Sequence, residues 1–172
     1  MTGAVRVAVL TVSDRSFRGE REDLGGPAVA AAARRLLAAE VVEVKVVPDE
    51  KDDIVWQLTR FADNVHVDVV LTTGGTGISV RDVTPEATRS VVGFEVPGLA
   101  EAMRAASRAA LPAAMLSRQF AGVRGKTLVV NLPGSPKGAV ECLEAIAAAL
   151  PHAVAMLRGE VGDAHPVRGD GA

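Results

Sequence analysis

Residues 67–77 read VDVVLTTGGTG, and this stretch decides the fold. Residues 67–71 form an apolar run of the kind found in buried strands. Gly74, Gly75 and Gly77 follow within four positions, where they let the backbone come close to a ligand. A row of free N–H groups at the end of a strand suits an anion, most often a phosphate. The stretch predicts an α/β protein with a phosphorylated ligand at the sheet edge, although a tight strand-to-helix connection uses similar glycines.

The glycine loop lacks two common nucleotide-binding patterns. It has no Gly-Lys-Ser/Thr ending of a Walker loop, and no Gly-x-Gly-x-x-Gly dinucleotide fingerprint. The missing lysine argues against an unrelated Mg²⁺-dependent nucleotide hydrolase.

Strands and helices alternate along the chain. Strands are expected at residues 5–12, 41–47, 67–71 and 127–132, with helices at 27–39, from 49, from 84, at 99–111, 139–150 and 153–157. Residues 14–25 are predicted to be a loop, and residues 113–125 irregular structure or a short strand. This order predicts a mostly parallel sheet with helices on both faces, in one domain over residues 1–159 with a flexible tail at 160–172.

Composition excludes several classes of protein. The net charge is −2, no Lys/Arg cluster stands out, and aromatic residues make up 3%, so we expect no nucleic-acid partner. The one cysteine excludes an intrachain disulfide framework and a cysteine-based zinc site. No signal pattern and no run of 18 apolar residues occurs, so we expect a cytoplasmic protein without a membrane partner.

Polar residues follow four of the predicted strands. They are Ser13 and Asp14, Asp49 and Glu50, the glycine loop, and residues 131–138. Ligands of such sheets bind outside the carboxyl ends of the strands. Carboxylates beside a phosphate loop are typical of Mg²⁺ sites, which makes Asp49 and Asp82 candidate metal ligands.

Each of these residues also has a plainer interpretation. Asp49 can cap the following helix, and Asp14 can cap a turn. Asp82 can cap a turn with Arg81 as its surface partner. Residues 131–134 can be only a strand-to-helix turn.

The motifs together resemble the molybdopterin adenylyltransferase family, which includes the G domains of gephyrin-type proteins. The resemblance rests on TGGTG at residues 73–77 with RDVTPEAT at 81–88, and on TVSD at 11–14, VPDE at 47–50, MLSR at 115–118 and NLPGSP at 131–136. It runs from about residue 5 to residue 159. It implies a three-layer α/β/α sandwich with a mostly parallel mixed sheet, the molybdopterin-binding-like fold.

The resemblance also implies a reaction. Family members transfer AMP from Mg-ATP to the terminal phosphate of molybdopterin and release pyrophosphate. It assigns the Mg²⁺ and catalytic roles to Asp49 and Asp82. It assigns ligand binding to a larger set: Ser13, Gly74, Gly75, Thr76, Gly77, Arg81, Ser117, Arg118, Asn131, Pro133 and Gly134. It further implies a homotrimer and a molybdate-inserting enzyme as a possible partner.

The charged loop at residues 16–26 matches the family least well. It leaves open whether Arg18 or Arg21 reaches a ligand phosphate. Two alternatives also stay open: a molybdopterin-binding paralogue with weak or different activity, and a non-catalytic trimeric scaffold.

Overall fold

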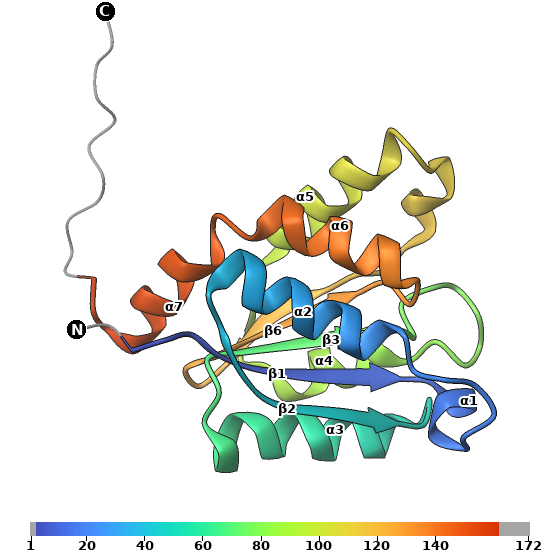
Figure 1. Cartoon of the computed structure of the whole chain (residues 1–172), viewed down its shortest axis with the longest axis horizontal. Coiled ribbons are helices and arrows are strands. Elements are labelled where there is room, and N and C mark those ends of the chain that lie inside the picture. Colours follow the sequence, from blue (N-terminus) through green and yellow to red (C-terminus); the bar gives the residue numbers. More distant parts are fainter. Residues whose placement is uncertain (1–2, 162–172) are drawn as a thin grey trace, which may run out of the picture.

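The computed structural model describes residues 3–161 as a six-stranded sheet between helices (Figure 1). Most of the expected tail, residues 160–172, lies outside the described residues. The elements in chain order are β1 (Arg6–Val12), α1 (Asp14–Phe17), α2 (Gly25–Leu37), β2 (Glu40–Val47), α3 (Lys51–Arg60), the π-helix η1 (Phe61–Val65), β3 (Val69–Thr73), α4 (Thr84–Val91), β4 (Phe94–Glu95), α5 (Pro97–Arg108), the 3₁₀ helix η2 (Pro112–Leu116), β5 (Ala121–Arg124), β6 (Thr127–Leu132), α6 (Pro136–Ile146) and α7 (Leu150–Arg158).

The sheet is mostly parallel, as predicted. Its strand order is β2-β1-β3-β6-β5-β4, and β2, β1, β3 and β6 run in the same direction. Strands β5 and β6 are antiparallel, as are β4 and β5. The fold-class prediction of a mixed, mostly parallel α/β sheet is therefore confirmed.

Two apolar cores cover the two faces of the sheet because both faces of its strands are apolar. Val7 and Val9 of β1 point to the core under α2, α5, α6 and α7. Ala8 and Leu10 point to the opposite core under α3, η1 and α4. Figure 1 shows the same division, with α2, α5 and α6 on one side of the sheet and α3 and α4 on the other. This arrangement is the predicted three-layer sandwich.

Several local predictions differ from the structure. The expected loop at residues 14–25 begins with α1, which is capped because Ser13 Oγ accepts a hydrogen bond from the Ser16 N–H at 3.2 Å. The two-residue strand β4 was not predicted, because its two exposed residues show no apolar pattern. No single helix among residues 3–161 is long and apolar enough to cross a membrane, and only α6 and α7 together, bent by 64°, pass that test.

The chain changes direction across the sheet between β1 and β3. After β1, the connection through α2 leads to β2 on one side, and the connection through α3 then leads back to β3 on the other side. Crevices outside the carboxyl ends of strands form at such a switch point. The ends of β1 and β3 are therefore where the fold itself favours a ligand site.

Candidate active site

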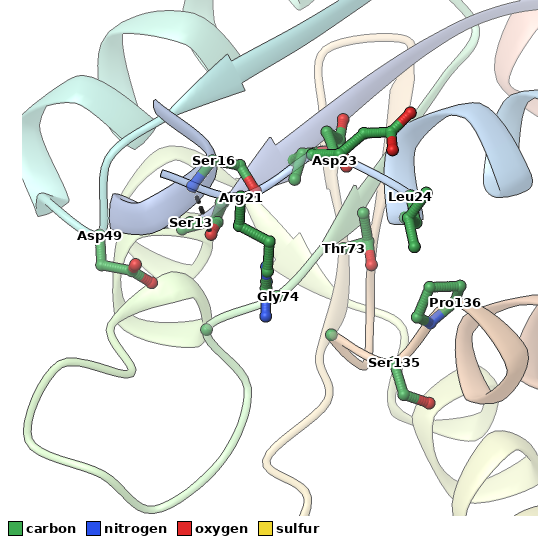
Figure 2. Close-up of a pocket in the computed structure, with 16 residues that line it drawn as sticks. Ser13, Ser16, Arg21, Asp23, Leu24, Asp49, Thr73, Gly74, Ser135 and Pro136 are labelled. Carbon is green, nitrogen blue, oxygen red and sulfur yellow. Dashed lines mark hydrogen bonds between the residues drawn. The ribbon is translucent and has the colours of Figure 1, made fainter. Parts of the chain in front are cut away.

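A cavity of about 590 Å³ lies at this switch point (Figure 2). Its walls come from four places around the ends of the strands: residues 11–13 and 16 with Asp49, residues 21–25, residues 73–75 and residues 134–136. Cavities of this size hold small-molecule ligands and cofactors. The cavity therefore lies where the polar strand ends predicted a ligand.

The backbone of the glycine loop is held in a conformation that only glycine adopts easily. Gly74 has φ +104° and Gly75 has φ +65°, and a Cβ on either residue would lie 2.2 Å from a neighbouring oxygen. Thr84 fixes this conformation, because its Oγ1 donates to the Gly74 carbonyl at 2.9 Å and its N–H to the Gly75 carbonyl at 3.1 Å. Within residues 3–161, the N–H groups of Gly75, Thr76 and Gly77 have no backbone acceptor. The loop thus presents donors that suit a phosphate.

The helix predicted from residue 84 begins there. Threonine often caps a helix, but Val83 occupies the cap position of α4 and Thr84 is the first helical residue. Its hydroxyl is buried and donates to the glycine loop instead. The residue type typical of a helix cap here stabilises the turn before it.

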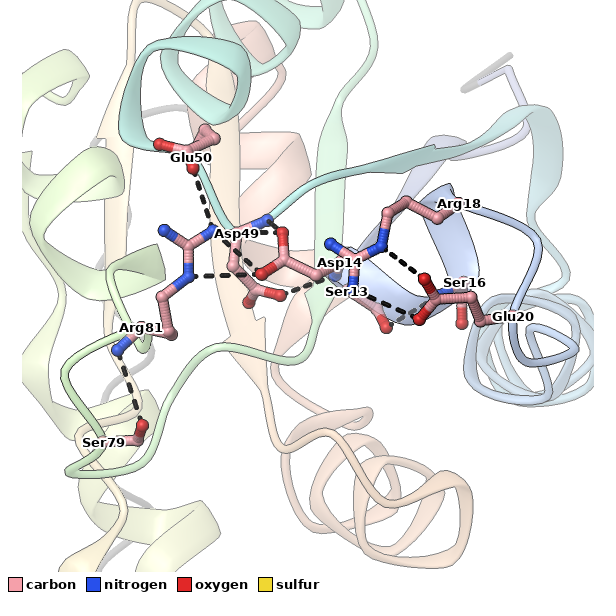
Figure 3. Close-up of polar contacts among 9 residues, drawn as sticks. All are labelled: Ser13, Asp14, Ser16, Arg18, Glu20, Asp49, Glu50, Ser79 and Arg81. Carbon is pink, nitrogen blue, oxygen red and sulfur yellow. Dashed lines mark hydrogen bonds and ion pairs between the residues drawn. The ribbon is translucent and has the colours of Figure 1, made fainter.

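Asp14 and Asp49 join the ends of β1 and β2 (Figure 3). The Asp14 N–H donates to Asp49 Oδ2 at 2.7 Å, and the Asp49 N–H donates to Asp14 Oδ1 at 3.0 Å. The hydrogen bond from the Asp49 N–H, and then Arg81, lower the pKa of Asp14. Burial raises the pKa of Asp49, and the negative charges of Asp14 and Asp82 raise it further. Asp49 is therefore a partly buried carboxylate among other acids, a setting that a bound cation would stabilise.

Asp82 closes the far end of the glycine loop. Its Oδ2 accepts a hydrogen bond from the Ser79 N–H at 2.8 Å. Among the described residues, no hydrogen bond reaches the Oδ1 atoms of Asp49 or Asp82. Each acid thus combines a turn-stabilising role with one oxygen free to bind another group.

Arg81 was predicted to bind a ligand, and in this structure it holds carboxylates. Its Nη2 lies 2.8 Å from Asp14 Oδ2 and 2.9 Å from Glu50 Oε1 (Figure 3). The side chain is half exposed, so solvent weakens both ion pairs. It connects the loop after β3 to the ends of β1 and β2.

Arg118 holds the glycine loop in place through hydrogen bonds to its carbonyl groups. Its N–H and Nε donate to the carbonyls of Thr76 and Gly77, at 2.8 and 2.7 Å. Its remaining nitrogens contact the Asp82 carbonyl and the Glu86 carboxylate. Each nitrogen of its guanidinium group contacts the protein, and binding of a ligand by Arg118 stays a prediction.

The predicted residues 131–134 divide into two groups. Asn131 is fully buried, and its Nδ2 donates to Thr72 Oγ1 at 3.0 Å and Thr88 Oγ1 at 2.9 Å, so its side chain faces α4 and not the cavity. Its Oδ1 has no hydrogen-bond partner among the described residues, and binding of a ligand by Asn131 stays a prediction. Pro133 offers its carbonyl to Thr73 Oγ1 at 2.8 Å, whereas Gly134 lines the cavity.

The structure thus brings together part of the predicted site. Ser13, Asp49, Gly74, Gly75 and Gly134 line the cavity. The other predicted residues are outside its lining, and five of them belong to the adjacent loop or contact it: Thr76, Gly77, Arg81, Asp82 and Arg118. Ser117 Oγ is buried and has no hydrogen-bond partner among the described residues.

The cavity wall at residues 21–25 was predicted only as part of a loop. Asp23 anchors this segment, because Thr11 Oγ1 donates to its Oδ2 at 2.9 Å and the Gly26 N–H to its Oδ1 at 3.0 Å. The alternation of charged residues there looked like a solvated loop. The useful signal was the glycine pair after Asp23, since a Cβ on Gly26 would lie 2.5 Å from Asp23 Oδ2.

Comparison with known proteins places this arrangement in a family. The pattern of the family described as a probable molybdopterin binding domain matches residues 8–152. The chain belongs to this family. The resemblance seen in the sequence motifs is therefore confirmed.

Members of this family with known names or structures match most of the chain. A molybdopterin adenylyltransferase of Helicobacter pylori strain J99 is 44% identical over 156 residues, which cover 90% of this chain and 89% of the relative. The crystal structure of the molybdopterin biosynthesis enzyme MoaB from Thermus thermophilus has a TM-score of 0.82 and 51% identity, covering 90% of this chain and 97% of that one. The tungsten cofactor synthesizing protein MoaB of Pyrococcus furiosus has a TM-score of 0.83 and 36% identity, covering 92% and 99%.

Proposed function

We propose that this protein is a molybdopterin adenylyltransferase of molybdenum cofactor biosynthesis. In the proposed reaction, an oxygen of the terminal phosphate of molybdopterin attacks the α-phosphorus of ATP. The new P–O bond joins AMP to the pterin phosphate, and the bond to the leaving pyrophosphate breaks. Transfer between phosphates relies on positioning and charge neutralisation, so the protein need not supply a nucleophile.

The observation that carries the proposal is the meeting of the glycine loop and two acids at one edge of the sheet. The loop offers N–H groups to phosphate oxygens, and Asp49 and Asp82 are near enough for the charge of one to raise the pKa of the other. The name and 44% identity of the Helicobacter pylori relative support the same reaction.

The donor set at this edge fits Mg²⁺. Magnesium is usually held by one or two carboxylates together with phosphate oxygens and water, and Asp49 and Asp82 each keep one free oxygen. When bound, Mg²⁺ neutralises charge on the reacting phosphates. Among residues 3–161 no group of three His, Cys, Asp or Glu side chains is placed to hold a metal, so phosphate oxygens of the nucleotide would have to complete the proposed site.

The remaining residues would hold and orient the two substrates. The N–H groups of residues 75–77 would bind phosphate oxygens, and Thr84 and Arg118 would keep the loop in place. Ser13 and Gly134 line the cavity, and in this proposal Ser117, whose buried hydroxyl has no partner among the described residues, would bind the pterin. A homotrimer, a cytoplasmic location and delivery of the product to a molybdate-inserting enzyme belong to the same proposal.

The test is a product assay with purified protein, molybdopterin and Mg-ATP. We expect adenylylated molybdopterin by mass spectrometry and one pyrophosphate for each product molecule. Binding of molybdopterin without either product would instead indicate the pterin-binding paralogue. No binding of either substrate would contradict the proposal altogether.

A further inference from the structure

One cationic side chain in the cavity takes no part in the roles described above. Arg21 lines the cavity and is the only Arg or Lys among its lining residues within the described part of the chain. Figure 2 shows its side chain extending from the loop before α2 into the cavity, toward the level of Gly74. It therefore faces the loop whose N–H groups suit a phosphate.

Two other arginines at this edge are already paired with acidic side chains. Arg18 makes two hydrogen bonds with Glu20, at 2.7 and 3.2 Å, and lies outside the cavity lining. Arg81 is held by Asp14 and Glu50. In contrast, no hydrogen bond or ion pair engages the Arg21 guanidinium among residues 3–161.

The backbone around Arg21 is fixed on both sides. One residue earlier, the Glu20 N–H donates to the Arg15 carbonyl at 2.9 Å. Two residues later, Asp23 is hydrogen bonded to Thr11 and to the N–H of Gly26. The fold thus holds the start of the Arg21 side chain at the cavity wall and leaves its charged end free.

Among the described residues, the acidic side chains that line the cavity form no hydrogen bond or ion pair with Arg21. Asp23 uses both oxygens in its own hydrogen bonds, and Asp49 accepts from the Asp14 N–H. Glu22 is exposed beside Arg21 without a hydrogen bond to it in the described residues. A guanidinium group in this position suits a phosphate, which it can bind through two parallel N–H donors.

We infer that Arg21 binds a phosphate group of one of the two substrates, opposite the glycine loop. The inference rests on the proposed function, and it deepens it by adding a substrate-binding residue outside the sequence motifs. Two phosphates could supply the ligand: the triphosphate of ATP and the terminal phosphate of molybdopterin. The same guanidinium chemistry would serve either one.

The experiment compares Arg21→Gln with the matched control Arg18→Gln, which removes one positive charge from the same loop outside the cavity. Wild type and both variants are titrated by calorimetry with Mg-ATP and, separately, with molybdopterin. We expect Arg21→Gln to weaken binding of one of these at least about tenfold, with Arg18→Gln within about twofold of wild type. The weakened ligand identifies which phosphate Arg21 binds, and Arg21→Lys should recover part of the loss.

Two outcomes would overturn the inference. One is wild-type affinity of Arg21→Gln for both ligands, and the other is equal weakening by Arg21→Gln and Arg18→Gln, which would indicate only long-range charge. Thermal melting checks that the variants fold, as expected for an exposed side chain. Because the titrations need no turnover, a wild type that binds both ligands but forms no product refutes the proposed reaction without refuting the role of Arg21.

Discussion

Asp68 and Asp63 at the amino end of the parallel sheet are held differently from Asp49 and Asp82 at its carboxyl end. At the amino end, Asp68 accepts two hydrogen bonds from Arg158, at 2.8 and 2.7 Å, and one from the Arg6 N–H at 2.7 Å. Asp63 is held by two donors of Arg124, at 3.0 and 2.6 Å. At the carboxyl end, Asp49 and Asp82 each receive one backbone hydrogen bond and keep one oxygen free.

This difference separates carboxylates that stabilise the fold from carboxylates that can bind a ligand. A carboxylate held by a bidentate arginine has little capacity left for a ligand. A carboxylate near other acids, at a strand end beside a cavity, can still gain from a cation. The same residue types therefore have different roles, which depend on their partners and not on their identity.

The largest expected effect is on catalysis at the carboxyl end. Asp82→Asn should lower the rate of adenylyl transfer at least about 100-fold, because it removes a charge from the metal-binding pair. Asp63→Asn, at the amino end, should leave the rate within about twofold of wild type. Steady-state release of pyrophosphate measures the rate of each variant. Equal rates would contradict the claim that only the acid at the carboxyl end takes part in catalysis.

Replacing a glycine by alanine should cost more folding stability at the carboxyl end than at the amino end. Gly75→Ala should cost about 3 kcal/mol, because φ is positive and the new Cβ would meet Thr84 Oγ1. Gly125→Ala, in the turn between β5 and β6, should cost only about 1 kcal/mol, since φ is positive there but the surrounding space is open. Urea unfolding of the two variants gives both values, and equal costs would show that Thr84 does not restrict the loop.

The paired charges of the amino end should matter for folding and not for turnover. Arg158→Ala removes both hydrogen bonds to Asp68 and two more to backbone carbonyls, so we expect a loss of about 1–3 kcal/mol. The hydrogen bond to Asp68 raises the pKa of Arg158. Denaturant unfolding measures the loss, while kcat should stay near the wild-type value; a large fall in kcat would link this end to the site.

The smallest effect is expected for a hydroxyl at the carboxyl end. Ser117→Ala should change stability by less than about 0.5 kcal/mol, because Ser117 Oγ has no partner to lose among the described residues. At the amino end, Thr127→Val should cost about 1–3 kcal/mol, since Thr127 Oγ1 donates to the Val67 carbonyl at 2.6 Å and its loss leaves that buried carbonyl unpaired. Paired melting curves test this, and a costly Ser117→Ala would mean that the hydroxyl already has a structural role.

Much of the fold could be predicted because four segments are rich in apolar and β-branched residues. The strand predicted at residues 127–132 has the observed bounds, and the parallel order followed from the alternation with helices. The four-residue helix α1 and the two-residue strand β4 were missed, since so few residues carry no periodic pattern. Their presence depends on hydrogen bonds to distant parts of the chain.

Only the site residues that directly follow a strand could be predicted from the sequence. The glycine loop and Asp49 follow strands directly, so parallel order brings them together. The inward direction of Asn131 could not be inferred, because both faces of β6 are buried. Arg81 contacts Asp14 across 67 positions of sequence, and no local pattern indicates such a pairing.

The most direct test of the account is metal binding with the nucleotide present. Mn²⁺ can replace Mg²⁺ as a spectroscopic probe, and its binding in the presence of ATP can be followed by electron paramagnetic resonance. The account predicts that Asp49→Asn and Asp82→Asn each weaken Mn²⁺ binding at least about tenfold, while Asp63→Asn binds as wild type does. Unchanged Mn²⁺ affinity in both Asp49→Asn and Asp82→Asn would contradict it.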